Sequence, residues 1–136
     1  MKVFLVSESG TGINFFPELE ALLARRIAGL DCRSIFVPFP EDIPAAVKQV
    51  VSEADLIFVF VLYDELDFRI KALLDKLIEL DMSSKAKIVK VIEESEFEGL
   101  DRARLEREKQ KLAGKWSSFI VDLLFNPDSF RPKERR

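Results

Sequence analysis

The sequence predicts a three-layer α/β domain, in which a four-stranded parallel sheet carries helices on both faces. Four short runs of apolar, β-branched and aromatic residues alternate along the chain with segments of helical periodicity. These runs are apolar throughout, which is typical of strands that are buried on both faces. The 136 residues leave room for one domain, which we expect at 1–130, followed by a polar tail at 131–136.

The expected elements follow one another in the order βαβαβαβα. We expect strands at Lys2–Ser7, Cys32–Pro38, Asp55–Leu62 and Lys87–Ile92. Residues typical of helix ends delimit the segments between them: Asn14 and Gly29 bound the first helix, Asp42 begins the second, the third runs from about Glu65 to Met82, and the fourth runs from near Gly99 to Asn126. Each of these helices has an apolar side that can cover the sheet.

Right-handed crossovers between parallel strands bring the carboxyl ends of the strands to one edge of the sheet. Ligands of open α/β sheets bind beyond this edge. In this chain the edge is expected to consist of 7–14, 38–42, 62–65 and 93–98. We therefore expect a binding site in these loops.

Composition excludes several classes of function. The sequence contains no histidine, so a triad with an imidazole base and a His-ligated metal are both excluded, and we expect neither a metal nor a resident cofactor. The net charge of −3 argues against a nucleic-acid partner, because domains that bind nucleic acids usually carry a basic excess.

Two features bear on the compartment. The longest apolar run, Leu56 to Tyr63, is much shorter than the roughly 20 residues that span a bilayer, and no signal-peptide pattern opens the chain. The single cysteine, Cys32, fits a reducing compartment and is expected to be a small core residue. We therefore expect a cytoplasmic protein without a membrane partner.

The loop after the first strand, 7–12, reads SESGTG. A loop of this kind between a strand and a helix offers backbone amides and the positive end of the helix dipole to a phosphate. It is similar to the loop that holds the FMN phosphate in flavodoxins, so a flavodoxin-like FMN-binding module is one alternative. Short Gly/Thr loops also occur as plain turns, and the carboxylate of Glu8 disfavours a nearby anion.

Acidic residues follow the third strand. Asp64 or Glu65 could act as a general acid or base, or could accept hydrogen bonds from ligand hydroxyls. Acidic residues at the start of a helix also cap it and complement its dipole, and this is the interpretation that we favour. Arg69 and Lys71 follow within one helical turn and could pair with these acids.

Self-association is expected from the residues alone. A four-stranded sheet has two open edges, and the twelve phenylalanines of the chain exceed what one small core requires. Open strand edges and spare aromatic surface both favour contact with further copies of a chain. We therefore expect a homo-oligomer.

Three segments resemble the lumazine synthases and the archaeal-type riboflavin synthases. The segment 37–48, VPFPEDIPAAVK, resembles the pattern VPG…(E/D)LP…A.K of these enzymes. The segment 54–59, ADLIFV, follows at the family's distance and resembles its DIV motif. The segment 123–130, LLFNPDSF, resembles the LLF-x-P-x-x-(L/F) close of the archaeal riboflavin synthases. The resemblance spans nearly the whole chain.

This resemblance implies a flavodoxin-like topology and a homopentameric ring with active sites between neighbouring subunits. The ligand would be a ribityllumazine, a flat bicyclic ring with a polyol arm. The reaction would be that of riboflavin synthase, the transfer of a four-carbon unit between two such molecules. The residues expected to bind this lumazine or flavin-like ligand are Ser7, Ser9, Gly10, Thr11, Asn14, Pro38, Phe39, Asp42, Ile43, Leu62 and Tyr63.

Departures from the family pattern leave a second interpretation open. The first loop lacks the family's ring-stacking aromatic residue, Phe39 replaces a glycine, and Ile70 stands near the position of a histidine that the family uses in the chemistry. A non-catalytic, oligomeric ligand-binding paralogue would keep the pocket without the reaction. The sequence leaves open whether the chain is an enzyme, with Asp64 and Glu65 as the catalytic candidates.

Overall fold

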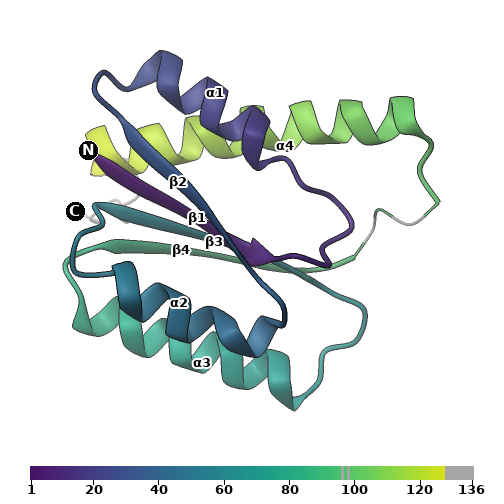
Figure 1. Ribbon diagram of the computed structural model, residues 1–136, viewed down its shortest axis with the longest axis horizontal. Coiled ribbons are helices and arrows are strands. Elements are labelled where there is room, and N and C mark those ends of the chain that lie inside the picture. Colours follow the sequence, from purple (N-terminus) through teal and green to yellow (C-terminus); the bar gives the residue numbers. More distant parts are fainter. Residues whose placement is uncertain (96, 98, 128–136) are drawn as a thin grey trace, which may run out of the picture.

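The computed structural model describes residues 1–95, 97 and 99–127, and this part of the chain forms one four-stranded sheet between two layers of helices (Figure 1). The strands are β1 (Lys2–Glu8), β2 (Asp31–Val37), β3 (Leu56–Tyr63) and β4 (Lys87–Glu94). Their order is β2-β1-β3-β4, and neighbouring strands are parallel. This order agrees with a flavodoxin-like fold, so the predicted fold class is confirmed. The tail expected at 131–136 lies outside the described residues.

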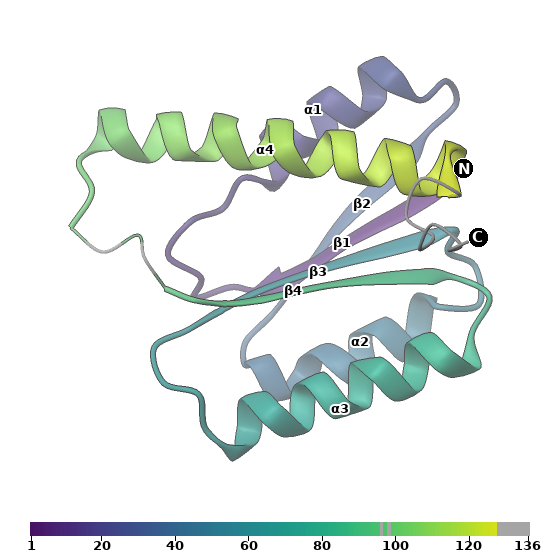
Figure 2. The same ribbon diagram turned by 180° about the vertical axis from the view of Figure 1, so that it is seen from behind.

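The helices lie on the two faces of the sheet in pairs (Figures 1 and 2). Helices α1 (Phe16–Arg26) and α4 (Arg102–Phe125) cover one face, and α2 (Ile43–Val50) and α3 (Phe68–Ser83) cover the other. A short 3-10 turn, η1 (Pro40–Asp42), leads into α2. Among the described residues, no helix combines the length and the apolar composition that crossing a membrane would require.

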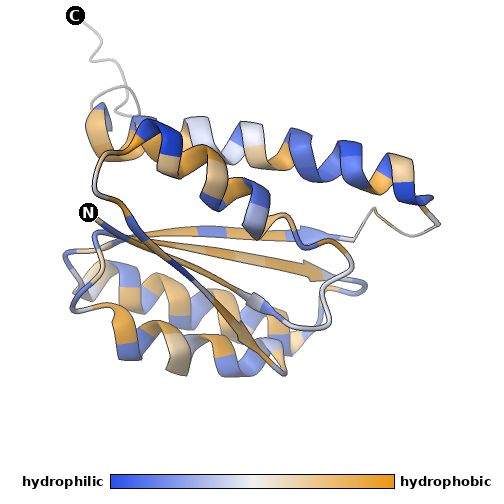
Figure 3. Cartoon of the chain, turned by 45° about the horizontal axis from the view of Figure 1, so that its top comes forward, coloured by the Kyte–Doolittle hydropathy of each residue, from blue (hydrophilic) through white to orange (hydrophobic). Residues whose placement is uncertain are grey.

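Two apolar layers hold the helices to the sheet, because alternate residues of each strand point to opposite faces. The layer under α1 and α4 contains Leu5 and Phe58, and the layer under α2 and α3 contains Val6 and Val59. Figure 3 shows the strands coloured mainly as hydrophobic, with hydrophilic residues along the helices. The two inner strands, β1 and β3, are therefore buried on both faces, as the apolar runs predicted, whereas the edge strands β2 and β4 are buried only in part.

An aromatic cluster fills the layer under α1 and α4. Phe58 lies at its centre, with its ring centroid 5.4 Å from that of Trp116. Phe15 and Phe16, at the start of α1, lie 6.3 and 6.2 Å from Phe58, and Phe15 meets Phe60 edge to face at 4.8 Å. Aromatic pairs in such geometries stabilise the fold beyond the burial of their surface. The cluster accounts for several of the phenylalanines that suggested self-association.

Side-chain caps set the starts of two helices at other positions than expected. Helix α3 begins at Phe68 rather than near Glu65, because the carboxylate of Asp67 accepts hydrogen bonds from the backbone N–H groups two and three residues later. Helix α4 begins directly after Asp101, which caps it in the same way, rather than near Gly99. Both corrections shift helix starts towards the C-terminus and lengthen the loops before them.

The expected caps of the first two helices are also corrected. Asn14 Oδ1 accepts a hydrogen bond from the N–H of Phe16, but the N-cap position of α1 belongs to Phe15. Asp42 precedes α2 without a side-chain cap hydrogen bond. Gly29 was expected to stop the first helix, but α1 already ends at Arg26, with the extended Ile27 as its C-cap. Gly29 lies in the turn that follows, with φ 69°, a left-handed conformation that glycine adopts without strain.

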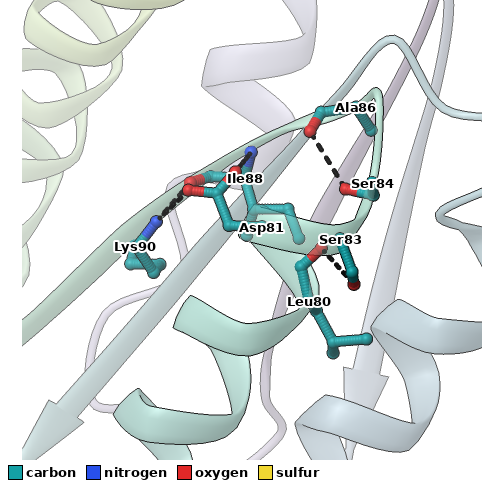
Figure 4. Close-up of polar contacts among 7 residues, drawn as sticks. All are labelled: Leu80, Asp81, Ser83, Ser84, Ala86, Ile88 and Lys90. Atoms are coloured by element: carbon teal, nitrogen blue, oxygen red, sulfur yellow. Dashed lines mark hydrogen bonds and ion pairs between the residues drawn. The ribbon is translucent and has the colours of Figure 1, made fainter.

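A polar cluster covers the amino half of the outer edge of β4 (Figure 4). The N–H of Lys87 donates to the carbonyl of Asp55 and therefore points towards β3. Backbone groups of successive residues in a strand point to opposite sides of that strand, so the N–H and C=O of Ile88 point away from β3, towards the open edge. Asp81 of α3 accepts a hydrogen bond from Ile88 N at 3.2 Å, and Lys90 Nζ donates to Ile88 O at 2.9 Å. The two charged groups also pair, with Lys90 Nζ 2.7 Å from Asp81 Oδ2. This ion pair therefore occupies edge groups that another strand would need.

We expect Asp81→Ala to lower the free energy of unfolding by about 1–2 kcal/mol, because it removes a charged hydrogen-bond acceptor and leaves Lys90 without its partner. Urea unfolding followed by circular dichroism measures the change. Glu79→Ala is the matched control, since it removes an exposed pair with Lys76 and should cost less than about 0.5 kcal/mol. Equal effects of the two substitutions would contradict the role given to Asp81.

Candidate functional site

The loops that follow the strands meet at one edge of the sheet, and two neighbouring clefts open there. The first, called here the aromatic cleft, has a volume of about 420 Å³ and is lined by Phe39, Pro40, Glu41, Leu62, Tyr63, Asp64, Glu65, Asp67, Arg69 and Ile70. The second, the polar cleft, has a volume of about 270 Å³ and is lined by Glu8, Gly10, Thr11, Gly12, Leu62, Asp64, Ser95 and Phe97. Leu62 and Asp64 line both, so the clefts adjoin at the end of β3.

Hydrogen bonds between loops hold this edge together. Ser9 donates its backbone N–H at 2.8 Å and its hydroxyl at 3.2 Å to the carbonyl of Val37, which ties the first loop to the end of β2. The N–H of Ser95 donates to the carbonyl of Tyr63 at 2.8 Å, which ties the loop after β4 to the end of β3. The clefts therefore have fixed backbone walls, and less ordering is needed when a ligand binds.

The structure brings part of the predicted site together. Predicted residues that line the clefts are Gly10, Thr11, Phe39, Leu62 and Tyr63, together with the catalytic candidates Asp64 and Glu65. Asp64 and Glu65 are exposed. Capping of the helix, the interpretation that the sequence favoured for them, is performed by Asp67 instead. Both carboxylates therefore stay available to a ligand.

Other predicted residues serve the fold instead. Ser7 is buried, and its hydroxyl donates to the carbonyl of Phe60 at 2.7 Å. Ile43 is fully buried in the layer under α2 and α3. Predicted residues that line neither cleft are Ser9, Asn14, Pro38 and Asp42. The expectation that Ser7 and Ile43 contact a ligand is corrected, because their side chains point into the interior.

Several lining residues were not predicted as ligand contacts, above all Glu41, Asp67 and Arg69. The sequence suggested that Arg69 pairs with the acids before it, but no ion pair joins it to another described residue. The connection between β3 and α3 is long enough for the first turn of α3 to reach the aromatic cleft. A cap at Asp67, three residues before the apolar Ile70, was the sequence signal for this late start.

Carboxylates dominate the charge of both clefts. The lining carboxylates are those of Glu8, Glu41, Asp64, Glu65 and Asp67, against the guanidinium of Arg69. Burial, together with repulsion from the nearby Glu41, raises the pKa of Glu8 above its ordinary value of 4.5. The clefts therefore favour hydrogen-bond donors, such as ligand hydroxyls, over anions.

The first loop offers little to a phosphate. The N–H of Ser9 is donated to the carbonyl of Val37, and the N–H of Thr11 to the carbonyl of Glu8 at 3.2 Å. The carboxylate of Glu8 lies 3.1 Å from the position that a Cβ atom on Gly10 would take. The N–H groups of Ser9 and Thr11 are already hydrogen-bonded within the protein, and the carboxylate of Glu8 lies beside Gly10. Both features disfavour the binding of an anion at this loop.

We expect Glu8→Gln to stabilise the fold at neutral pH. Because the pKa of Glu8 is raised in the folded state, the folded protein binds this proton more tightly than the unfolded protein. The free energy of unfolding therefore falls as the pH rises above 4.5, the ordinary pKa of this carboxyl group. The gain in the variant should be present at about pH 7 and should vanish below about pH 4, where both states are protonated. Thermal unfolding at the two pH values measures it. A variant that is less stable than the wild type at neutral pH would contradict this electrostatic cause.

Neither a metal centre nor a reactive thiol appears in the described part of the chain. Within residues 1–95, 97 and 99–127, no three or more Cys, Asp or Glu side chains are arranged to hold a metal ion. Cys32 of β2 is half-buried, and burial, with the nearby Glu20 and Asp31, raises the pKa of its thiol to about 12. The thiol is therefore protonated at neutral pH, which suits the packing role expected for it.

Comparison with known proteins adds to the fold but not to the site. No protein-family model matches the chain, and no curated protein matches it. Among solved structures, the chain is similar to the MID domain of the N. crassa Argonaute protein QDE-2, with a TM-score of 0.50 and 15% sequence identity over 92% of this chain and 98% of that chain. At this identity the likeness supports the α/β fold alone.

Proposed function

We propose that the chain binds a small molecule made of a flat ring and an uncharged polar arm, of the ribityllumazine or flavin kind, at the carboxyl edge of its sheet. The observation that carries the proposal is the junction at the end of β3, where Leu62 and Asp64 join an aromatic cleft to a polar one. Pockets for small ligands usually measure about 300–1,000 Å³. In this proposal the chain is a divergent relative of the lumazine and archaeal-type riboflavin synthases.

The aromatic cleft suits the ring. Phe39 is 60% exposed and Tyr63 is half-buried, and both line this cleft. An exposed aromatic side chain on a cleft wall is a stacking surface for a flat heteroaromatic ring. The family takes its stacking residue from the first loop, which has no aromatic residue in this chain. The second and third loops would supply the stacking surface instead.

The polar cleft suits a polyol arm. It combines the carboxylates of Glu8 and Asp64 with the hydroxyls of Thr11 and Ser95. Carboxylates accept hydrogen bonds from ligand hydroxyls, whereas they repel a phosphate. The charge of this cleft therefore favours a ribityl arm over the phosphorylated arm of FMN, and a flavodoxin-like FMN module is the weaker alternative.

A transfer of a four-carbon unit between two ribityllumazine molecules, as in riboflavin synthase, is the second candidate function. Asp64 favours it, because this carboxylate lines both clefts and so lies beside a ligand bound across them, where a general acid or base is needed. Ile70 lines the aromatic cleft, near the position at which the resemblance puts the family's histidine. Proton transfer would then fall to Asp64 or Glu65. A paralogue that binds without reacting would not need these groups.

The same kinship carries further proposals. The chain would form a homo-oligomer, which is pentameric in the family, and would work in the cytoplasm without a resident cofactor. A small molecule would be its ligand. Its net charge of −3 and the acidic clefts argue against a nucleic-acid partner.

Titration of the protein with 6,7-dimethyl-8-ribityllumazine tests the proposal. We expect saturable quenching of the ligand's fluorescence, and only weak competition by FMN. Incubation at high protein concentration, followed by chromatography for riboflavin, separates the two functions. Riboflavin formation supports the transferase, whereas binding without product supports a non-catalytic binding protein. Absence of saturable binding would remove both.

A further inference from the structure

Helix α3 carries a stripe of exposed apolar side chains. Its large apolar side chains are Phe68, Leu74, Ile78 and Met82, and the exposed fraction reaches 77% at Phe68 and 84% at Met82. Lys71 and Asp75 lie between them, so positions 68, 71, 75, 78 and 82 recur at spacings of three and four residues. Side chains at these spacings share one side of a helix. These six residues are called the α3 stripe below.

The α3 stripe lies on the flank of the helix beside β4. The side of α3 that faces the sheet is buried at Leu73 and Leu77. Lys76, Leu80 and Ser83 border a groove that α3 shares with α2, so they mark the other flank. Asp81, which reaches the edge of β4, follows position 78 by three residues and lies on the same side as the stripe. The side chains of the stripe therefore face solvent on the side of α3 next to the edge strand β4.

The charges of the α3 stripe are self-complementary. No ion pair joins Lys71 or Asp75 to another described residue, although they lie four residues apart. Phe68 precedes Lys71 by three residues, and Ile78 follows Asp75 by three. An antiparallel second helix that places Lys71 opposite Asp75 therefore also places Phe68 opposite Ile78. The same contacts then occur twice, related by a two-fold axis.

We propose that the α3 stripe binds a second copy of this chain through an antiparallel, two-fold helix contact. A two-fold interface requires a self-complementary surface, in which residue i meets residue j and j meets i. The stripe meets this condition with two reciprocal Lys71–Asp75 ion pairs at the centre and two Phe68–Ile78 contacts outside them. The spacing of three and four residues is that of helices that pack along a common seam.

Extension of the sheet through the edge of β4, the edge beside the α3 stripe, is one competing way to join two copies. The pair of Asp81 and Lys90 occupies the outward backbone groups of Ile88, which a ladder between two β4 strands would need at its amino half. Such a ladder would have to open a hydrogen-bonded ion pair. The α3 stripe needs no such rearrangement, so the helix surface is favoured.

Size-exclusion chromatography with light scattering on the full chain tests the proposal. We expect the wild type at an even multiple of the 15.6 kDa of one chain, either as a dimer or as two rings joined through this contact, and Lys71→Asp at half the wild-type mass, because like charges then meet at both central contacts. Adding Asp75→Lys to Lys71→Asp exchanges the charges and should restore the wild-type mass. Lys76→Asp makes the same change in charge on the flank towards α2 and should leave the mass unchanged.

Ile78→Glu tests the apolar part of the contact in the same assay and should also halve the mass. Circular dichroism shows whether each variant is folded, so that loss of the contact is separated from loss of the fold. The proposal is overturned by a wild type of single-chain mass at every concentration. It is equally overturned by an assembly, such as a pentamer, whose mass Lys71→Asp leaves unchanged, or by a double variant that does not recover the wild-type mass.

Discussion

Replacing Phe58 by alanine should lower the free energy of unfolding by about 3–5 kcal/mol, the largest loss expected from one substitution in this chain. Phe58 is fully buried, and its ring packs against those of Phe15, Phe16 and Trp116. These neighbours belong to the first helix and the last, so the cavity would lie where α1, α4 and the sheet meet. Close-packed surroundings collapse only partly into such a cavity. Urea unfolding followed by far-ultraviolet circular dichroism measures the loss.

Phe39→Ala is the matched control for this prediction, because it removes the same side chain from a position that is 60% exposed. We expect it to change the free energy of unfolding by no more than about 0.5 kcal/mol. If both variants lost equally little stability, the aromatic cluster would not be the main junction between the sheet and its covering helices α1 and α4.

The same Phe39→Ala substitution should weaken the binding of 6,7-dimethyl-8-ribityllumazine about tenfold. Loss of an aromatic stacking partner costs up to about 1.5 kcal/mol, and a tenfold change in affinity corresponds to about 1.4 kcal/mol. The exposure of Phe39 separates this effect from folding, because the side chain contributes little to the core. Fluorescence titration of the variant and the wild type gives the two dissociation constants.

Phe125→Ala controls for the loss of an exposed phenylalanine elsewhere. Phe125 is 52% exposed at the end of α4 and lines neither cleft. This variant should bind the ligand as the wild type does. An unchanged affinity in Phe39→Ala, with the fold intact, would rule out the aromatic cleft as the place of the ring.

The fold could be predicted because a strand that is buried on both faces consists of consecutive apolar residues, which can be recognised in the sequence. In β3 every residue from Leu56 to Val61 is buried, and few structures other than an interior parallel strand require six apolar residues in succession. This apolar pattern is weaker in β2, an edge strand in which Arg33 and Phe36 are exposed. Helix starts were harder to predict, since several acidic residues precede α3 and hydrogen-bond geometry selects Asp67 among them.

The place of the candidate site could be predicted, but its residues only in part. Parallel strands bring their carboxyl ends to one edge whatever the side chains are. Which side chains line that edge depends on where each strand stops. Strand β1 continues to Glu8, so Ser7 points into the sheet, and turn η1 makes Ile43 the first residue of α2, facing the core. Successive side chains of a strand point to opposite faces, so Ser7 is buried although Glu8, one residue later, lines the polar cleft.

A nuclear magnetic resonance titration of isotope-labelled protein with 6,7-dimethyl-8-ribityllumazine tests most directly whether the two clefts form one binding site. We expect the amide signals of both clefts to shift together with one apparent affinity, among them those of Gly10, Thr11, Phe39, Asp64 and Ser95. Shifts confined to the groove between α2 and α3, or two groups of shifts with unrelated affinities, would contradict a single ligand bound across the end of β3.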